Sequence, residues 1–273
     1  MTPKDGNVRA VVCFCHGYTD HASFVNLVEN QRLVEAGIAF CALEYEGHGR
    51  SDGPMGLIAD WDRLIDDTTD YFTEIAEQYP NTPVFLFGES MGGAVAYCTY
   101  QRMAHLLRGV LLGFPMCKIS DDMLPSQWVI DLLVWLIGPS GTAGWLGYLP
   151  IAPAQQSLDD VSQRDPLKRL MSSRDPLSFS RNPRLATARE LIDVTKRISD
   201  SLETFEAPLF VFHGLADKVT DPQLSQLLYD ESPSDDKTIR LYEGMWHNLT
   251  TGEPDENIDR VYGDIISWIQ ERI

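Results

Sequence analysis

The stretch from Pro83 to Tyr97, Pro-Val-Phe-Leu-Phe-Gly-Glu-Ser-Met-Gly-Gly-Ala-Val-Ala-Tyr, decides the fold. An apolar run typical of a buried strand leads into Gly-x-Ser-x-Gly, and an alanine-rich helix start follows. In this context the turn strains the backbone of Ser90, while Gly88 and Gly92 let neighbouring backbone approach. The pattern predicts Ser90 as a nucleophile, with the N–H of Met91 as an oxyanion donor at a helix N-terminus. A structural turn with a solvent-facing serine is the alternative.

A serine hydroxyl needs a general base, and the base needs an acid that fixes its tautomer. After this kind of turn the chain order is Ser, then Asp or Glu, then His. His105, His213 and His247 follow Ser90 in the sequence. We expect His105 at the surface and His213, at the end of a strand, to shape the loop that carries Asp217. The order therefore predicts Asp217 as the orienting acid and His247, in a loop after the next strand, as the general base.

The second oxyanion donor should come from a loop after an earlier strand. Residues 9–15 have the composition of a buried strand, and His16, Gly17 and Tyr18 follow directly. A flexible glycine there would turn the next amide toward the nucleophile. We therefore expect the N–H of Tyr18 to be the second donor. Taken alone, the His-Gly pair would equally fit a plain strand-ending turn.

Short motifs are spread along nearly the whole chain in a fixed order. They resemble the monoacylglycerol lipase and lysophospholipase branch of the serine α/β-hydrolases, including its plant-type members. The resemblance implies the family more firmly than the substrate, because the same motifs serve esterases that act on several lipids and on phenolic esters. The matching stretches are residues 16–21, 44–53, 88–93, 174–177, 184–191, 213–217 and 246–247.

Length and composition fit one domain with an insertion, since 273 residues with 44% hydrophobic content can bury a full-sized core. Strand-like and helix-like segments alternate, which predicts an α/β fold with a mostly parallel sheet and helices on both faces. The strands are expected near 9–15, 38–44, 83–88, 108–114, 208–213 and 237–242. The helices are expected near 23–36, 60–78, 91–103, 221–230 and 256–272.

The chain departs from the family pattern in two places. Most relatives begin with an antiparallel hairpin before the His-Gly strand, so the N-terminal edge strands are expected to be missing here. Lipases of the animal type also carry an arginine four residues after the acid of the His-Gly loop, where it helps hold the polar head of the substrate. In this chain Asp20 is followed at that spacing by Phe24. This difference bears on glycerol recognition and leaves ester hydrolysis unaffected.

The alternation stops between the strands near 108–114 and 208–213. We assign residues 1–115 and 207–273 to the hydrolase core and residues 116–206 to an inserted helical cap. The apolar run 128–137 is too short to span a bilayer, and it fits either a helix buried in the core or a lid. In the lid interpretation, an acyl pocket is lined by Trp128, Leu132, Leu133, Trp135 and Leu136. Two copies of Arg-Asp-Pro-Leu, at 164 and 174, are expected to be helix starts or turns.

The charge and the cysteine content limit which partners and which cellular compartment are expected. A net charge of −18 disfavours nucleic acid and anionic membranes. Any membrane contact through the cap is therefore expected to be apolar and transient. The N-terminus does not resemble a signal peptide. Five cysteines, an odd number, suggest reduced thiols and a cytoplasmic protein, peripheral at lipid surfaces. Cys13 and Cys15 lack further ligands nearby, so we expect packing rather than a metal site. No cofactor is expected.

The sequence thus predicts a serine carboxylic-ester hydrolase that cleaves monoacylglycerol to fatty acid and glycerol through an acyl-enzyme. A lysophospholipase and a phenolic-ester esterase of the caffeoyl-shikimate type remain alternatives. An acyltransferase is less favoured, because the chain lacks the His-x4-Asp pattern that often accompanies acyl transfer. Ser90 excludes chemistry that needs an aspartate at the turn. A catalytically silent ligand-binding protein is disfavoured because all three members of a triad are present.

Overall fold

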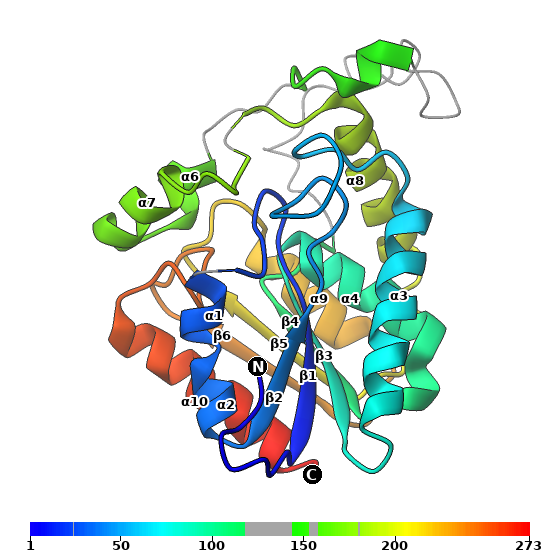
Figure 1. Cartoon of the computed structure of the whole chain (residues 1–273), viewed down its shortest axis with the longest axis vertical. Helices are drawn as coiled ribbons and strands as arrows, with labels where there is room; N and C mark the ends of the chain where they lie inside the picture. Colours follow the sequence, from blue (N-terminus) through cyan, green and yellow to red (C-terminus); the bar gives the residue numbers. More distant parts are fainter. Residues whose placement is uncertain (24, 118–143, 153–157, 180) are drawn as a thin grey trace.

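A parallel sheet of six strands runs through the centre of the protein (Figure 1). The computed structural model describes every residue except 24, 118–143, 153–157 and 180. Among the described residues the strands are ordered β2-β1-β3-β4-β5-β6, and every pair is parallel. Their bounds are β1 (Ala10–Cys15), β2 (Ile38–Ala42), β3 (Val84–Glu89), β4 (Gly109–Gly113), β5 (Leu209–Gly214) and β6 (Lys237–Tyr242).

The strand order reverses direction between β1 and β3, which is the switch point of the sheet. The chain passes from β1 out to β2, returns to the other side of β1 as β3, and then continues outward to β6. In open parallel sheets, ligands bind outside the carboxyl ends of the strands where the order reverses. The loop after β1 and the turn after β3 therefore border the natural position of a site.

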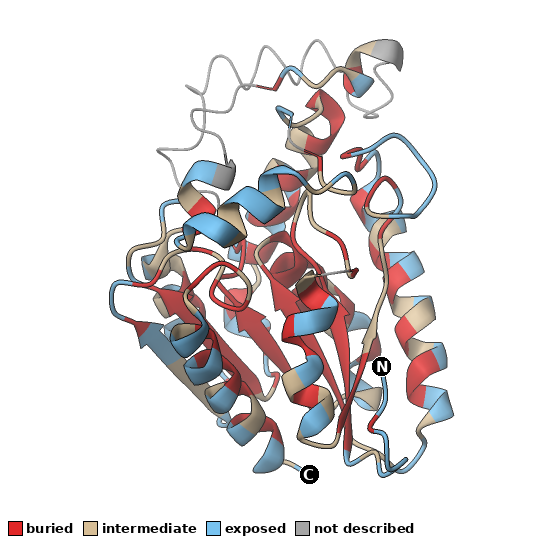
Figure 2. Ribbon diagram, turned by 60° about the vertical axis from the view of Figure 1, so that its left-hand side comes forward, coloured by how far each residue is buried: buried red, intermediate tan, exposed pale blue. Residues whose placement is uncertain are grey.

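Helices cover both faces of the sheet (Figures 1 and 2). One face carries α2 (Gln31–Glu35), preceded by α1 (Val25–Glu29), together with α10 (Asp255–Gln270). The other carries α3 (Trp61–Gln78), α4 (Met91–Met103), α8 (Leu185–Ser199) and α9 (Pro222–Glu231). A short 3-10 turn, η1 (Ala104–Leu106), follows α4. This arrangement confirms the predicted fold class.

Alternate residues of each strand pack into two separate hydrophobic cores, one on each face of the sheet. In β1, Val11 and Cys13 pack toward α3 and α4, whereas Val12 and Phe14 pack toward α10. Because successive side chains of a strand point to opposite faces, a strand buried on both sides is apolar throughout. All six residues of β1 are buried accordingly. Figure 2 shows the central strands as the buried middle of the molecule, with exposed residues on the outer sides of the helices and along the edge strand β6.

The predicted elements agree with the described ones to within two residues at each end, with one exception. The helix expected over 23–36 is two short helices that meet at Asn30, whose side chain donates to the carbonyl of Asn26 (2.8 Å). No described strand lies outside β2. At that edge Met1 and Phe40 exchange backbone hydrogen bonds, with the Met1 amine donating to Phe40 O (2.6 Å) and Phe40 N to Met1 O (2.9 Å).

The predicted cap is described only in part. Its described elements are η3 (Gly144–Tyr148), α6 (Leu158–Ser162), α7 (Pro166–Ser173), α8 and η4 (Leu202–Thr204). The expected lid residues Trp128, Leu132, Leu133, Trp135 and Leu136 lie outside the described residues. The described helix α8 packs through Leu191, Val194 and Ile198 into the same core as α4. The division into core and cap stays a prediction.

The two Arg-Asp-Pro-Leu copies begin a helix and a turn, as expected. Asp165 caps α7, accepting from the N–H groups of Leu167 (2.8 Å) and Lys168 (3.1 Å), with proline as the first helical residue. Asp175 accepts from the N–H of Leu177 (2.9 Å) in a turn. The same four residues therefore serve two local structures.

Candidate active site

Ser90 lies in a strained turn between β3 and α4. Its backbone has φ 54° and ψ −121°, a conformation that L-residues rarely adopt. The two flanking glycines are required by close approach of the backbone. A Cβ on Gly88 would lie 2.1 Å from the carbonyl oxygen of Gly92, and one on Gly92 would lie 1.9 Å from that of Cys15. The local sequence thus forces the serine hydroxyl out of the sheet.

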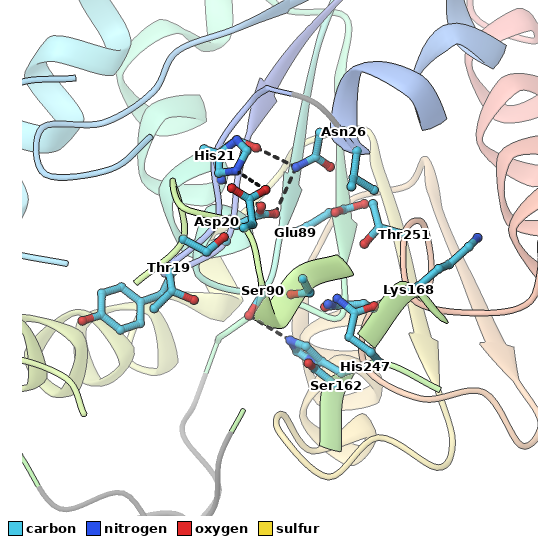
Figure 3. Close-up of a pocket in the computed structure, with 18 of the residues that line it drawn as sticks. Thr19, Asp20, His21, Asn26, Glu89, Ser90, Ser162, Lys168, His247 and Thr251 are labelled. Atoms are coloured by element: carbon cyan, nitrogen blue, oxygen red, sulfur yellow. Dashed lines mark hydrogen bonds and ion pairs between the residues drawn. The ribbon is translucent and has the colours of Figure 1, made fainter. Parts of the chain in front are cut away.

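The structure brings Ser90, His247 and Asp217 together in a hydrogen-bonded chain. Ser90 Oγ lies 3.0 Å from His247 Nε2, and His247 Nδ1 lies 2.7 Å from Asp217 Oδ2 (Figure 3). His247 is 4% exposed, and the Asp217 side chain is fully buried. The carboxylate accepts a hydrogen bond from the Nδ1–H group, which keeps the proton on Nδ1 and leaves Nε2 unprotonated, able to take the proton of the serine hydroxyl.

The Asp217 carboxylate accepts five hydrogen bonds. Its Oδ1 accepts from the N–H groups of Val219 (2.7 Å) and Thr220 (3.2 Å). Its Oδ2 accepts from His247, from His213 Nε2 (2.8 Å) and from Thr220 Oγ1 (3.0 Å). Burial alone would raise the pKa of Asp217, but the charge of His247 and the hydrogen bonds from both imidazoles lower it below its ordinary value. Asp217 is therefore ionised throughout the physiological range.

His213 holds Asp217, as the sequence indicated. It is completely buried, and its Nε2–H donates to Asp217, so its Nδ1 accepts from the Ser225 hydroxyl (2.6 Å). The rival carboxylate Asp221 caps α9 instead, accepting from the N–H of Gln223 (2.9 Å). His105 is exposed, as expected.

Sequence reasoning missed two residues beside His247. The ring of Phe114 meets its imidazole edge to face at 4.6 Å between centroids. Phe114 has φ 37°, so the backbone after β4 is strained at this point. The Thr220 hydroxyl lies within 3.3 Å of His247 Nδ1 and of His213 Nε2. Neither residue belongs to a recognisable motif, so only the tertiary structure identifies them.

The expected oxyanion donors flank Ser90. Met91 is the first residue of α4, where backbone N–H groups have no intrahelical acceptor. The Tyr18 N–H has no acceptor among the described residues, and the Tyr18 hydroxyl donates to Gly56 O (2.9 Å). The strained residue of this loop is Thr19, with φ 66°, rather than Gly17. A Cβ on Gly17 would make an ordinary contact of 3.6 Å with that of Ser90, so the conformational reason we gave for this glycine was wrong.

A pocket extends from Ser90 to a polar end formed by Asp20, Asn26 and Glu89 (Figure 3). Asn26 donates to Asp20 Oδ2 (3.0 Å). Asn26 Oδ1 and Glu89 Oε1 are buried and have no hydrogen-bond partner in the described structure. Burial raises the pKa of Glu89 to about 8, with a further contribution from the charge of Asp20. Burial also raises the pKa of Asp20. This end of the pocket is therefore polar and rich in oxygen atoms.

The described residues show no group of three or more His, Cys, Asp and Glu side chains arranged to hold a metal ion. All five cysteines are free thiols, and burial raises the pKa of Cys15 and of Cys117 to about 12. Within the described part of the chain, no helix has both the length and the apolar character that crossing a membrane requires.

The doubly covered parallel sheet, with a strained serine turn at its switch point, defines an α/β-hydrolase. Residues 6–255 match the family described as serine aminopeptidase S33 (Hydrolase_4), and the chain belongs to that family. It is a serine hydrolase that cleaves carboxylic esters.

Relatives and solved structures agree with this assignment. The chain is 33% identical to the caffeoylshikimate esterase of Arabidopsis thaliana, covering 99% of this chain and 80% of that one. It is 28% identical to the monoacylglycerol lipase of Mycolicibacterium smegmatis, covering 97% and 89%. The fold is similar to that of a soluble variant of the Saccharomyces cerevisiae monoglyceride lipase, with a TM-score of 0.85, 17% identity, and 99% and 90% coverage.

Proposed function

We propose that the protein hydrolyses monoacylglycerols through an acyl-enzyme, with Ser90 as nucleophile, His247 as general base and Asp217 as the orienting acid. The 3.0 Å contact between Ser90 Oγ and His247 Nε2 carries this proposal. As the hydroxyl attacks the ester carbonyl, its proton passes to Nε2, and the imidazolium then gives that proton to the departing alkoxide. Water repeats the sequence with the acyl-enzyme and releases the fatty acid.

The N–H groups of Tyr18 and Met91 would hold the oxyanion of each tetrahedral intermediate. Both residues adjoin Ser90, one across the switch point of the sheet and one along the chain. Donors that are fixed in place before the reaction need no reorganisation when charge develops on the oxygen. The N-terminus of α4 adds the favourable end of its dipole.

The polar end of the pocket favours a neutral, hydroxyl-rich alcohol. Asp20, Asn26 and Glu89 offer oxygen acceptors, and a protonated Glu89 also donates, so the free hydroxyls of a glycerol ester could both give and receive hydrogen bonds there. The buried carboxyl of Asp20, whose pKa burial already raises, opposes a further negative charge there. This argues for monoacylglycerol over lysophospholipid, whose head carries a phosphate.

A phenolic ester of an anionic alcohol is the second candidate, and Lys168 is the observation that favours it. Lys168 carries the only permanent positive charge among the described residues that line the pocket. It already pairs with Asp255 (2.8 Å) and lies 3.6 Å from Glu29. A carboxylate on the substrate would have to compete with both.

A substrate panel with two variants tests these assignments. Ser90→Ala should reduce hydrolysis of every ester by about 10³-fold or more, because only binding and the oxyanion hole remain. Glu89→Leu should lower kcat/KM for a 1-monoacylglycerol much more than for the methyl ester of the same acid, whereas Glu89→Gln should retain most of the preference. Faster hydrolysis of a caffeoyl ester of an anionic alcohol than of any monoacylglycerol would favour the second candidate.

The same proposal covers location and lipid contact. Five unpaired thiols support a cytoplasmic protein. Helix α7 exposes Leu167 (65%), Leu170 (44%) and Met171 (41%) beside the pocket, which supports transient apolar contact with lipid. Weak cosedimentation with neutral phosphatidylcholine vesicles, reduced by Leu167→Ser with Leu170→Ser, is expected. Equal sedimentation of wild type and double variant would contradict the contact.

A further inference from the structure

The loop that carries His247 is held by the end of α6 and the short segment that leads from it into α7. The N–H of Asn248, directly after the histidine, donates to Ser162 O (3.0 Å). Figure 3 shows Ser162 and His247 beside each other. The segment approaches so closely that a Cβ on Gly252 would lie 2.2 Å from Gln163 Oε1. The backbone N–H groups of residues 164 and 165 both donate to Gly252 O, each at 2.9 Å.

A buried carboxylate completes this arrangement. Glu253 is 0% exposed, and its Oε1 accepts from the N–H of Trp246, directly before the histidine, at 2.7 Å. Its Oε2 accepts from Asn257 Nδ2 (2.6 Å) and from Arg164 Nη1 (3.4 Å). The same Arg164 nitrogen donates to Gly244 O (2.9 Å), at the start of the loop. Arg164 therefore joins one end of the loop to the carboxylate that fixes its centre.

From these contacts we infer that Arg164 and Glu253 are positioning residues that hold His247 at hydrogen-bonding distance from Ser90. The inference rests on the proposed role of His247 as the base. The amides on both sides of this histidine are tied down, one to Glu253 and the other to Ser162. An error of about 1 Å in the position of a reacting group can cost about 10²-fold in rate, so a loosened loop should reduce kcat. Neither Arg164 nor Glu253 lines the pocket, so KM should not change.

The second Arg-Asp-Pro-Leu copy supplies a matched control. Arg174 occupies the position of Arg164 in the other copy, is exposed, and makes no side-chain hydrogen bond or ion pair among the described residues. Its removal changes the same charge on the same stretch of chain without touching the His247 loop. Arg164→Ala and Arg174→Ala can therefore be compared directly.

The test measures kcat and KM for a short soluble ester well below the unfolding temperature. Arg164→Ala should lower kcat by about 10- to 100-fold with KM unchanged, and Arg174→Ala should match wild type. The Arg164 side chain is 43% exposed, so a small cation can reach its position. Guanidinium chloride at low millimolar concentration should therefore restore part of the kcat of Arg164→Ala, whereas sodium chloride of equal ionic strength should not.

Glu253→Gln is the second variant. Both oxygens of the Glu253 carboxylate accept hydrogen bonds, so the NH₂ group of glutamine would face a donor and one of these hydrogen bonds would be lost. It should lower kcat at least as much as Arg164→Ala. If Arg164→Ala does not fold, Arg164→Lys is measured in its place, with a smaller loss of kcat expected. Unchanged kcat in the folded Arg164 variant, or a loss that guanidinium does not relieve, would overturn the inference. Ester hydrolysis that survives Ser90→Ala would instead overturn the proposed function.

Discussion

Replacing Glu89 by glutamine should make the protein more stable at alkaline pH. The variant keeps the size and polarity of the side chain but cannot ionise. In the wild type, burial raises the pKa of Glu89 from 4.5 to about 8, so the folded state holds a proton that the unfolded chain has released. A raised pKa contributes stability at low pH, and this contribution is lost as the pH rises. Between pH 4.5 and 8 this group therefore lowers the free energy of unfolding of the wild type, by at most about 1.4 kcal/mol per pH unit midway between the two pKa values and by less near each of them.

Over that interval the loss amounts to about 4 kcal/mol, a substantial part of the stability of an ordinary domain. Urea unfolding of both proteins between pH 4.5 and 8.5 measures it. The variant minus wild-type difference in unfolding free energy should rise between pH 4.5 and 8 and level off above pH 8, because only the wild type carries this ionisable group. Glu77→Gln, at an exposed position on α3, is the control for the substitution itself. A flat profile for Glu89→Gln would show that folding does not raise the pKa of this carboxyl and would remove the argument that a protonated Glu89 donates to the substrate.

Two further variants test the acid and the predicted lid. Asp217→Asn should lower kcat by about 10³- to 10⁴-fold, because the amide cannot fix the His247 tautomer. Asp221→Ala should cost only about 1 kcal/mol of unfolding free energy, through the lost helix cap. The reverse pattern in steady-state kinetics and thermal unfolding would assign the acid to Asp221. If the predicted lid lines an acyl channel, kcat/KM for monoacylglycerols should rise with chain length, by about 0.8 kcal/mol of transition-state binding per buried methylene. The double change Leu132→Ser with Leu136→Ser should then lower kcat/KM far more for long-chain monoacylglycerols than for a short aryl ester. Equal losses on both substrates would identify the segment as interior packing.

The sequence alone determined the strands and helices, the parallel character of the sheet, and the identity of the three residues in the hydrogen-bonded chain. The apolar run before Ser90 and the glycines around it define a strand, a turn and a helix through local sterics. Asp217 and His247 follow later strands, and because the carboxyl ends of parallel strands meet at one edge, residues far apart in sequence converge there. The strand alternation therefore predicted both the fold and the meeting of these side chains.

Only the tertiary structure decided what surrounds them. Phe114 and Thr220 contact His247 from two loops whose separation depends on the strand order, which no local pattern encodes. The polar end of the pocket joins the loop after β1 to the residue before Ser90 across the switch point, so the raised pKa of Glu89 depends on burial by distant segments. The two Arg-Asp-Pro-Leu copies are alike in sequence, yet only the arginine of the first reaches the His247 loop. Local sequence fixes backbone conformation over a few residues, whereas these contacts depend on how distant segments pack.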